Sequence, residues 1–214
     1  NVCGHGTHVA GIAAGRASSL LPTGLQGMAP DATIVPIQVF SFDISAVEAP
    51  RAFVADILEA LELMANLTTA GTLSNPITVN LSLGGDVTVW GDCSVNYPSA
   101  QQSIQKMFSW GVPIIAASGN SGYNNRVTFP ACMSKIIKVA SVNNDAAGIT
   151  RSSFSNLVLP SSFPADPNLP YGQYFFFAPG GGASTYIRSA NYSTTSTTQS
   201  NVLFQGTSQA APHV

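Results

Sequence analysis

Four short apolar runs, separated by segments with helical periodicity, constrain the fold of this chain most strongly. The runs are rich in Val, Ile and Leu and span residues 32–40, 77–85, 112–120 and 135–142. Continuous apolar runs of this length are typical of strands that are covered on both faces. Because strands that alternate with helices favour parallel pairing and right-handed crossovers, we expect an α/β fold with three layers, a mostly parallel central sheet flanked by helices.

Two helices are expected between these strands. Residues 50–67 carry apolar side chains at helical spacing, and Pro50 suits a position in the first turn. Residues 98–111 show the same spacing, with Gly111 as the expected stop. From about residue 150 the chain becomes rich in Pro, Gly, Ser and Thr, which predicts long surface connections interrupted by one strand at 173–178.

Composition narrows the function classes. Only 8% of the residues are charged and the formal net charge is −2, so we expect no attraction to nucleic acid or to anionic membranes. No apolar run reaches the length of about 18 residues that a membrane-spanning helix needs. The 214 residues contain no convincing linker, so we expect that residues 1–214 belong to a single domain.

Three short motifs stand in a definite order, GHGTHVAG at 4–11, ASGN at 117–120 and GTSQAAPHV at 206–214. Together they resemble the subtilisin-like serine proteases, the subtilase family, and the resemblance covers essentially the whole chain. Four intervening segments match the family pattern as well: GLQGMAPDA (24–32), VNLSLGG (79–85), RSSFSN (151–156) and FAPG (177–180). The resemblance implies a subtilisin-like fold and a serine endopeptidase that works through an acyl-enzyme intermediate.

The residue chemistry agrees with the family pattern. Ser208 stands at the expected start of a helix, where unpaired backbone N–H groups gather. A serine hydroxyl needs a base, and a neutral imidazole suits that task near pH 7. The resemblance implies His5 as the base, Ser208 as the nucleophile, and the amide of Asn120 with the Ser208 N–H as donors to the oxyanion.

The resemblance also implies a substrate cleft in which an extended peptide pairs with the backbone. The residues implied to line it are Ser82, Leu83, Gly84, Gly85, Ala117, Ser118 and Gly119, with Thr128 near the base of a side-chain pocket. Phe129–Pro130 is implied to be a cis peptide in the pocket wall. The glycines suggest an open, apolar pocket and cleavage after bulky apolar residues.

One part of the family pattern is missing. Subtilases carry an aspartate in a D-[ST]-G context before the histidine, and here every aspartate follows His5 and none has that context. We interpret the chain as an internal section of a longer catalytic domain, truncated at both ends, without the aspartate strand and the C-terminal helices. A piece of this kind is expected to be weakly active or inactive on its own.

Three other functions compete with this interpretation. The first is a catalytically dead subtilase-fold protein that binds peptides. The second is a serine esterase, disfavoured because GTSQA lacks the G-x-S-x-G elbow. The third is a metal site at His5 and His8, disfavoured because no HExxH pattern, third histidine or nearby carboxylate supports it. We therefore predict no metal ligands, and expect His8 to brace the site and His213 to cap or pack in the serine helix.

No cofactor is expected to be required. Residues 15–24 occupy the loop that binds calcium in many subtilisins, but they carry no carboxylate or side-chain amide, so that site is expected to be absent. The sequence leaves open whether calcium binds elsewhere. The expected partners are an extended peptide or protein substrate and, in addition, a propeptide or protein inhibitor, on a monomer.

Three cysteines are an odd number. Cys93 and Cys132 follow strands whose loops should border the same end of the sheet, so we expect them to form a disulfide. Cys3 either lies under the active site, pairs with a cysteine outside the chain, or is a small buried residue. Secretion is expected on indirect grounds alone.

Overall fold

The structure is a computed structural model, and it describes residues 4–16, 25–41, 50–73, 76–85, 88–89, 91–145, 148–158, 175–191 and 200–214. The helices are α1 (His5–Ala14), α2 (Val54–Thr69), α3 (Pro98–Ser109) and α4 (Thr207–Ala210), with 3₁₀ turns at Ser94–Asn96 and Ala211–His213. The strands are β1 (Phe40–Ser41), β2 (Arg51–Ala52), β3 (Val79–Leu81), β4 (Thr88–Val89), β5 (Ile114–Ala117), β6 (Val127–Thr128), β7 (Ile137–Asp145), β8 (Gly148–Arg151), β9 (Phe175–Pro179), β10 (Ile187–Asn191) and β11 (Ser200–Phe204).

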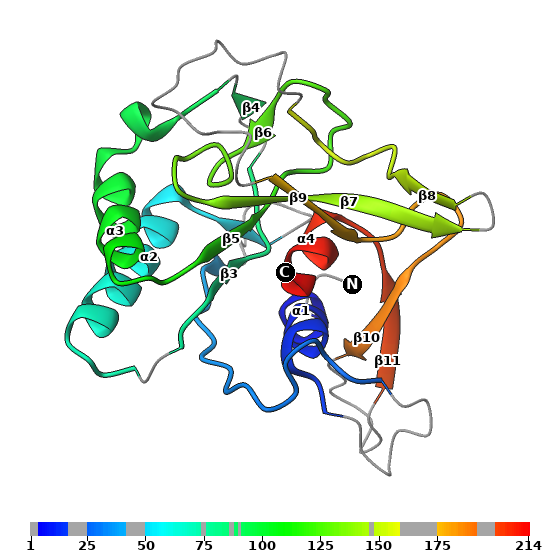
Figure 1. The fold of residues 1–214 in the computed structure, drawn as a ribbon, viewed down its shortest axis with the longest axis horizontal. Coiled ribbons are helices and arrows are strands. Elements are labelled where there is room, and N and C mark those ends of the chain that lie inside the picture. The colour runs from blue at the N-terminus through cyan, green and yellow to red at the C-terminus, as the bar shows by residue number, and fades with distance from the viewer. Residues whose placement is uncertain are drawn as a thin grey trace.

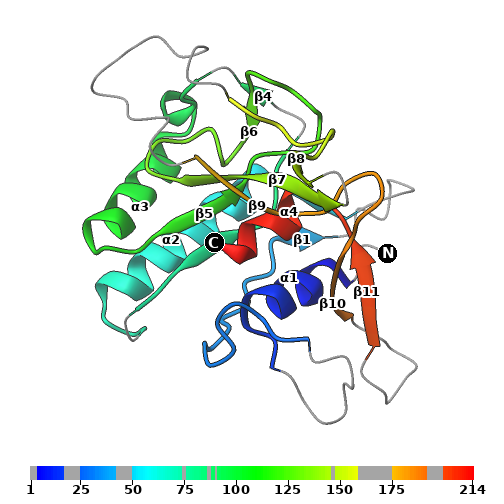
Figure 2. The same ribbon diagram turned by 45° about the vertical axis from the view of Figure 1, so that its right-hand side comes forward.

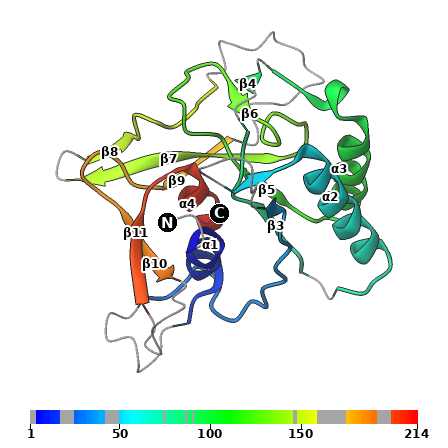
Figure 3. The same ribbon diagram turned by 180° about the vertical axis from the view of Figure 1, so that it is seen from behind.

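The central sheet has the order β3-β5-β7-β8, and β9 pairs with β7 as well. Strands β3, β5, β7 and β9 run parallel, and β8 is antiparallel to β7. Helices α2 and α3 lie on one side of this sheet, and α1 and α4 lie on the other (Figures 1 and 3). The expected three-layer α/β fold with a mostly parallel sheet is confirmed.

Strand β5 shows why both faces of the sheet are covered. Successive side chains of a strand point to opposite faces. Ile114 and Ala116 belong to the core that α2 and α3 form with the sheet, whereas Ile115 and Ala117 pack with Ala210 and Ala211 of the other helical layer. An apolar run without polar alternation can form a strand only where both faces are buried in this way.

Helix α1 is held against the hairpin of β10 and β11 (Figure 2). Its buried residues are His8 and Ile12, which are four positions apart and therefore on one face. Gly11 permits the close approach, because a side chain there would collide with Ser189 of β10. The hydroxyl of Ser189 donates a hydrogen bond of 2.8 Å to the His8 carbonyl. The packing thus joins a helix from one end of the chain to a hairpin from the other.

Two predictions about elements are wrong. The run at 32–40 is not a buried strand, since only Phe40 pairs, and Ile34 and Val35 are 45% and 51% exposed. Pro36 has no N–H to donate in the middle of this run, which disfavours a ladder there. Helix α2 begins at Val54, so Pro50 precedes β2 instead of entering the first turn. The runs at 77–85 and 112–120 contain β3 and β5, and the run at 135–142 covers the first part of β7. Helix α3 ends before Gly111, whose φ is +73°.

The described residues after position 150 contain more strands than the single one that the sequence predicts. The strand expected at 173–178 corresponds to β9, but β10 and β11 add a hairpin with five paired positions, from Ile187↔Phe204 to Asn191↔Ser200. The Ser- and Thr-rich composition between them concealed this pairing, which is not local in sequence. The structure therefore corrects the prediction of a single strand here.

The expected disulfide between Cys93 and Cys132 is present, with Cα atoms 5.4 Å apart. Phe129–Pro130 is a cis peptide, as expected. Cys3 and residues 17–24 of the presumed calcium loop lie outside the described residues. Among the described helices, none combines the length and the apolar character that crossing a membrane requires.

Candidate active site

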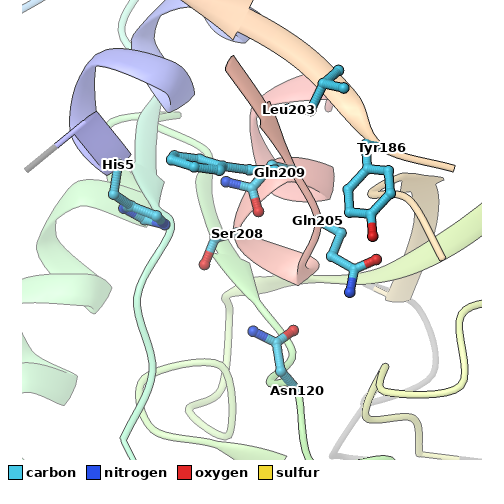
Figure 4. Close-up of a pocket in the computed structure, with 8 residues that line it drawn as sticks. His5, Asn120, Tyr186, Leu203, Gln205, Ser208 and Gln209 are labelled. Carbon is cyan, nitrogen blue, oxygen red and sulfur yellow. The ribbon is translucent and has the colours of Figure 1, made fainter. Parts of the chain in front are cut away.

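The three motif residues His5, Asn120 and Ser208 line one open pocket with a volume of about 430 Å³ (Figure 4). His5 begins α1, Asn120 follows β5 and Ser208 is the second residue of α4. Their positions follow from topology, because the carboxyl end of a parallel strand and the starts of two helices meet at one edge of the sheet. The structure therefore brings together the residues that the sequence motifs singled out.

The start of α4 is fixed by its neighbours. Gly206 has a φ of +153°, and the N–H groups of Gln209 and Ala210 donate to its carbonyl at 3.0 and 3.3 Å. The hydroxyl of Ser82 donates to the Ser208 carbonyl at 2.7 Å. This hydrogen bond joins the SLGG segment (82–85) to the backbone of Ser208 and thereby fixes the position of the segment relative to α4.

The orientation of Asn120 is set by Thr207. The Asn120 Oδ1 accepts hydrogen bonds from the backbone N–H and from the hydroxyl of Thr207, each at 2.9 Å. Only the carbonyl oxygen of a carboxamide can accept an N–H donor, so this pairing assigns the two ends of the side chain. The Nδ2 donor is left at the pocket, where Figure 4 shows Asn120 facing Ser208.

His5 is half-buried at the pocket. Burial lowers the pKa of His5 below 6.5, and the nearby His8 lowers it further. The imidazole is therefore neutral near pH 7, which is the form that can accept a proton. No carboxylate hydrogen-bonds to this ring among the described residues, and no three His, Cys, Asp or Glu side chains in that part of the chain are arranged to hold a metal.

His8 is fully buried and fastens α1 to the hairpin. Its Nε2 donates to the carbonyls of Ile187 and Val202 at 3.0 and 3.2 Å, which requires the proton on Nε2. Its ring packs against Phe204 with centroids 4.7 Å apart. Burial lowers the pKa of His8, although the two hydrogen bonds raise it in part. The bracing role expected for His8 agrees with these contacts, and His213 Nδ1 donates to the Gln209 carbonyl at 2.9 Å within the serine helix.

The candidate substrate residues converge on Thr128, which is 3% exposed. A Cβ at Gly84 would lie 2.5 Å from Thr128 Oγ1, and one at Gly119 would lie 2.7 Å from Thr128 Cγ2. Thr128 thus lies between the SLGG and ASG segments. Gly84 and Gly85 are exposed and Leu83 is half-buried, whereas Ser82, Ala117, Ser118 and Gly119 are buried.

A comparison of the sequence with known families agrees with the resemblance that the ordered motifs indicate. The sequence profile of the Subtilase family matches residues 1–214. This chain belongs to the subtilase family. The extracellular protease of Xanthomonas campestris pv. campestris is 30% identical over 213 residues, which are 98% of this chain and 31% of that protein. The subtilisin of Bacillus sp. strain TA39 is 31% identical over 213 residues, 98% of this chain and 44% of that protein.

Solved structures agree with the fold. A cold-adapted subtilisin-like serine proteinase superposes with a TM-score of 0.63 at 26% identity, over 100% of this chain and 59% of that protein. The subtilase chain therefore spans less than two thirds of the length of each of these relatives.

One wall of the pocket in this subtilase is formed by residues that were not among the predicted site residues. The hairpin contributes Leu203 and Phe204, the residues that flank its paired strands contribute Tyr186 and Gln205, and α4 contributes Gln209. Figure 4 shows Leu203 of β11 and Tyr186, which directly precedes β10, above Gln205. The signal that could have found part of this wall is adjacency, since Leu203, Phe204 and Gln205 directly precede the GTS motif. The amphipathic character of the wall indicates that it can contact apolar groups.

Proposed function

We propose that this subtilase chain forms part of the catalytic domain of a serine endopeptidase. In this proposal Ser208 is the nucleophile, His5 is the general base, and Asn120 Nδ2 and the Ser208 N–H stabilise the oxyanion. The observation that supports it is the arrangement of these three side chains around one pocket, with the Asn120 donor end fixed by Thr207.

The proposed reaction proceeds in two halves. Ser208 Oγ attacks the peptide carbonyl while its proton passes to His5, and the carbonyl oxygen becomes an oxyanion. His5 then gives the proton to the leaving amine, the C–N bond breaks, and an acyl-enzyme ester remains. Water attacks the ester with His5 again as base, and the proton returns to Ser208 Oγ as the acid product leaves.

The imidazolium form of His5 must be stabilised in this mechanism. Burial of His5 disfavours the imidazolium ion that forms during each half-reaction. A carboxylate beside the ring would favour that ion and hold the correct tautomer. The proposal therefore requires a carboxylate from outside the described residues.

The substrate in this proposal is an extended peptide or protein. Its backbone would pair with the SLGG and ASG segments as an added strand, and the side chain before the cleaved bond would enter toward Thr128. The narrow space around Thr128 limits the depth of that pocket, while its glycines keep the entrance open. We further propose that cleavage follows bulky apolar residues, and that a propeptide or protein inhibitor binds in the same cleft. The proposed protein is a secreted monomer.

Labelling with a fluorophosphonate tests the proposed function, because the reagent bonds only to an activated serine. The full-length protein that contains this chain should be labelled at Ser208, and Ser208→Ala should abolish labelling. Ser153→Ala removes an exposed serine outside the pocket and should leave labelling unchanged. A folded wild-type protein that resists the reagent would support the peptide-binding, catalytically dead alternative instead. Hydrolysis of a short ester without hydrolysis of casein would support the esterase.

A further inference from the structure

Lys138 is a lysine in the core of the protein that the proposed chemistry does not use. It lies on β7, between Ala116 of β5 and Phe175 of β9, and is 2% exposed. Ammonium groups are costly to bury unless hydrogen bonds and opposite charge compensate for lost hydration. A lysine at such a position therefore calls for a physical explanation.

The ammonium group of Lys138 is bound to the backbone turn of residues 128–136, which precedes β7. Its Nζ donates hydrogen bonds to the carbonyls of Met133 and Ile136, at 3.1 and 2.9 Å. Both of these residues are fully buried, so water has little access to their carbonyl groups. Hydrogen bonds from a charged donor are about twice as strong as neutral ones. The ammonium group therefore acts as an internal cation around which the turn is folded.

A negative charge lies near this cation. Burial lowers the pKa of Lys138 to about 8, and Asp92 acts in the opposite direction. The Asp92 Oδ1 accepts a hydrogen bond of 2.7 Å from the Ser94 N–H. The Ser94 hydroxyl in turn accepts from the Ser134 N–H at 3.1 Å, so the segment that holds Asp92 also binds the turn. Lys135, the charged residue within the turn, places its Nζ 4.2 Å from the centroid of the Phe108 ring.

The same turn contains Thr128, the residue on which the candidate substrate segments converge. The N–H of Met133 donates to the Pro130 carbonyl, and the N–H of Cys132 donates to the Thr128 carbonyl, both at 3.0 Å. The Phe129 carbonyl accepts from Gly85 of the SLGG segment at 3.3 Å. Hydrogen bonds and the short stretches of backbone between them therefore connect the Lys138 ammonium group to Thr128 and to Gly85.

We propose that Lys138 is a positioning residue, whose ammonium group holds the turn of residues 128–136 in the shape that forms the substrate pocket. The assignment of this pocket to a substrate rests on the proposed function, whereas the predicted effect of Lys138 on the turn does not. Lys138 touches neither the reacting atoms nor the peptide, and acts through the Met133 and Ile136 carbonyls. Its loss should weaken binding of the substrate side chain and leave Ser208 chemistry intact.

Hydrogen–deuterium exchange of the full-length protein tests the effect on the turn without reference to activity. Lys138→Met keeps an unbranched apolar side chain that reaches to the position of the lysine Cε, and it removes the charged nitrogen. Because two buried carbonyls lose a charged donor, the amides of residues 128–136 should exchange about tenfold faster or more. Exchange in α2 should not change. Lys135→Met, on the same turn but outside the core, should exchange like the wild type. Unchanged exchange at 128–136, or an equal increase everywhere, would overturn the proposal.

Steady-state kinetics distinguish the positioning role of Lys138 from the proposed endopeptidase activity. In Lys138→Met, KM for peptides with a bulky apolar residue before the cleaved bond should rise about tenfold. The values of kcat and of the fluorophosphonate labelling rate should stay within about threefold of the wild type. A fall in kcat at constant KM would overturn the positioning role. Faster exchange in the turn of a protein that no fluorophosphonate labels would uphold the effect on the turn and reject the endopeptidase.

A second measurement covers the case in which Lys138→Met does not fold. Raising the pH of the wild type through about 8 converts the ammonium group to an amine with fewer donors. After correction for the intrinsic pH dependence, exchange at 128–136 should rise between pH 7 and pH 10 relative to α2. A constant ratio over this range would overturn the proposal.

Discussion

The side-chain oxygen of Asn120 receives two hydrogen bonds from Thr207, the residue that precedes Ser208. Asn120 follows β5 and Thr207 begins α4, so a single pair of side chains joins the two segments that carry the proposed oxyanion donors. The Thr207 hydroxyl also accepts from the Gly119 N–H at 3.1 Å. One threonine hydroxyl therefore fixes both the backbone and the side chain of the turn beside the serine.

Substitution of Thr207 should lower turnover without weakening binding. Thr207→Val removes one of the two bonds that orient Asn120, and kcat should fall about tenfold at nearly constant KM. Thr207→Ser keeps the hydroxyl and should retain most of the activity. Asn120→Ala removes the donor itself and should cost about 10²–10³ in kcat, a magnitude measured on subtilisin and carried over here. Steady-state kinetics check all three, and a Thr207→Val variant with wild-type kcat would contradict the orienting role.

Gly119 should tolerate substitution poorly. Its φ is +110°, and a Cβ there would meet the Asn156 Nδ2 at 2.4 Å and a methyl group of Thr128 at 2.7 Å. Gly119→Ala should lower the free energy of unfolding by about 3 kcal/mol or more, from backbone strain and overpacking together. Gly111→Ala, at a φ of +73° in open space, should cost only about 1–2 kcal/mol. Denaturant unfolding measures both, and equal losses would show that the crowding around Gly119 is relieved elsewhere.

Acidification should destabilise the fold through His8. Because burial lowers its pKa in the folded protein, the unfolded chain binds more protons below pH 6.5. The free energy of unfolding should therefore fall as the pH drops from 7 toward 5, by at most about 1.4 kcal/mol per pH unit from this residue. His5 and His213 shift in the same direction and add to the effect. His8→Gln keeps an N–H donor without titrating, so its slope should be shallower; a parallel slope would assign the effect to other groups.

The disulfide should contribute strongly to stability. Cys93 and Cys132 are 39 residues apart, and closing a loop of that length in the unfolded chain is worth about 4 kcal/mol in the entropic model. The double variant Cys93→Ala/Cys132→Ala should lower the free energy of unfolding by about that amount. Chemical denaturation of oxidised and reduced wild type gives the matching comparison. A loss near zero in both experiments would indicate that the surrounding hydrogen bonds alone maintain the turn.

The sequence predicted the fold class because the decisive strands are buried on both faces. Strands β3, β5 and β7 are continuous apolar runs, and no local alternative competes with that pattern. The run at 32–40 has the same composition, but burial depends on neighbours that sequence periodicity does not report, and Pro36 interrupts its donors. The β10–β11 hairpin was missed for the opposite reason, since polar residues on half-exposed strands resemble a loop.

The candidate site divides in a similar way. Short motifs singled out His5, Asn120 and Ser208, and their catalytic roles stay predictions. The residues that hold them in place could not be found from spacing alone, because Thr207 binds a side chain 87 positions away and Ser82 binds a carbonyl 126 positions away. Lys138 lies in a run that the sequence predicts as a buried strand, but sequence patterns do not report its partners, which are backbone carbonyls in the turn before β7.

The attachment of α1 to the hairpin near the other end of the chain has a consequence for biosynthesis. His5 leaves the ribosome before the hairpin carbonyls that bind His8 and before the helix that carries Ser208, and most of the residues of this sequence are translated in between. A nascent polypeptide of this sequence thus holds an imidazole with no hydroxyl to activate. Proteolysis, if these residues perform it, cannot start while translation of the segment is still under way.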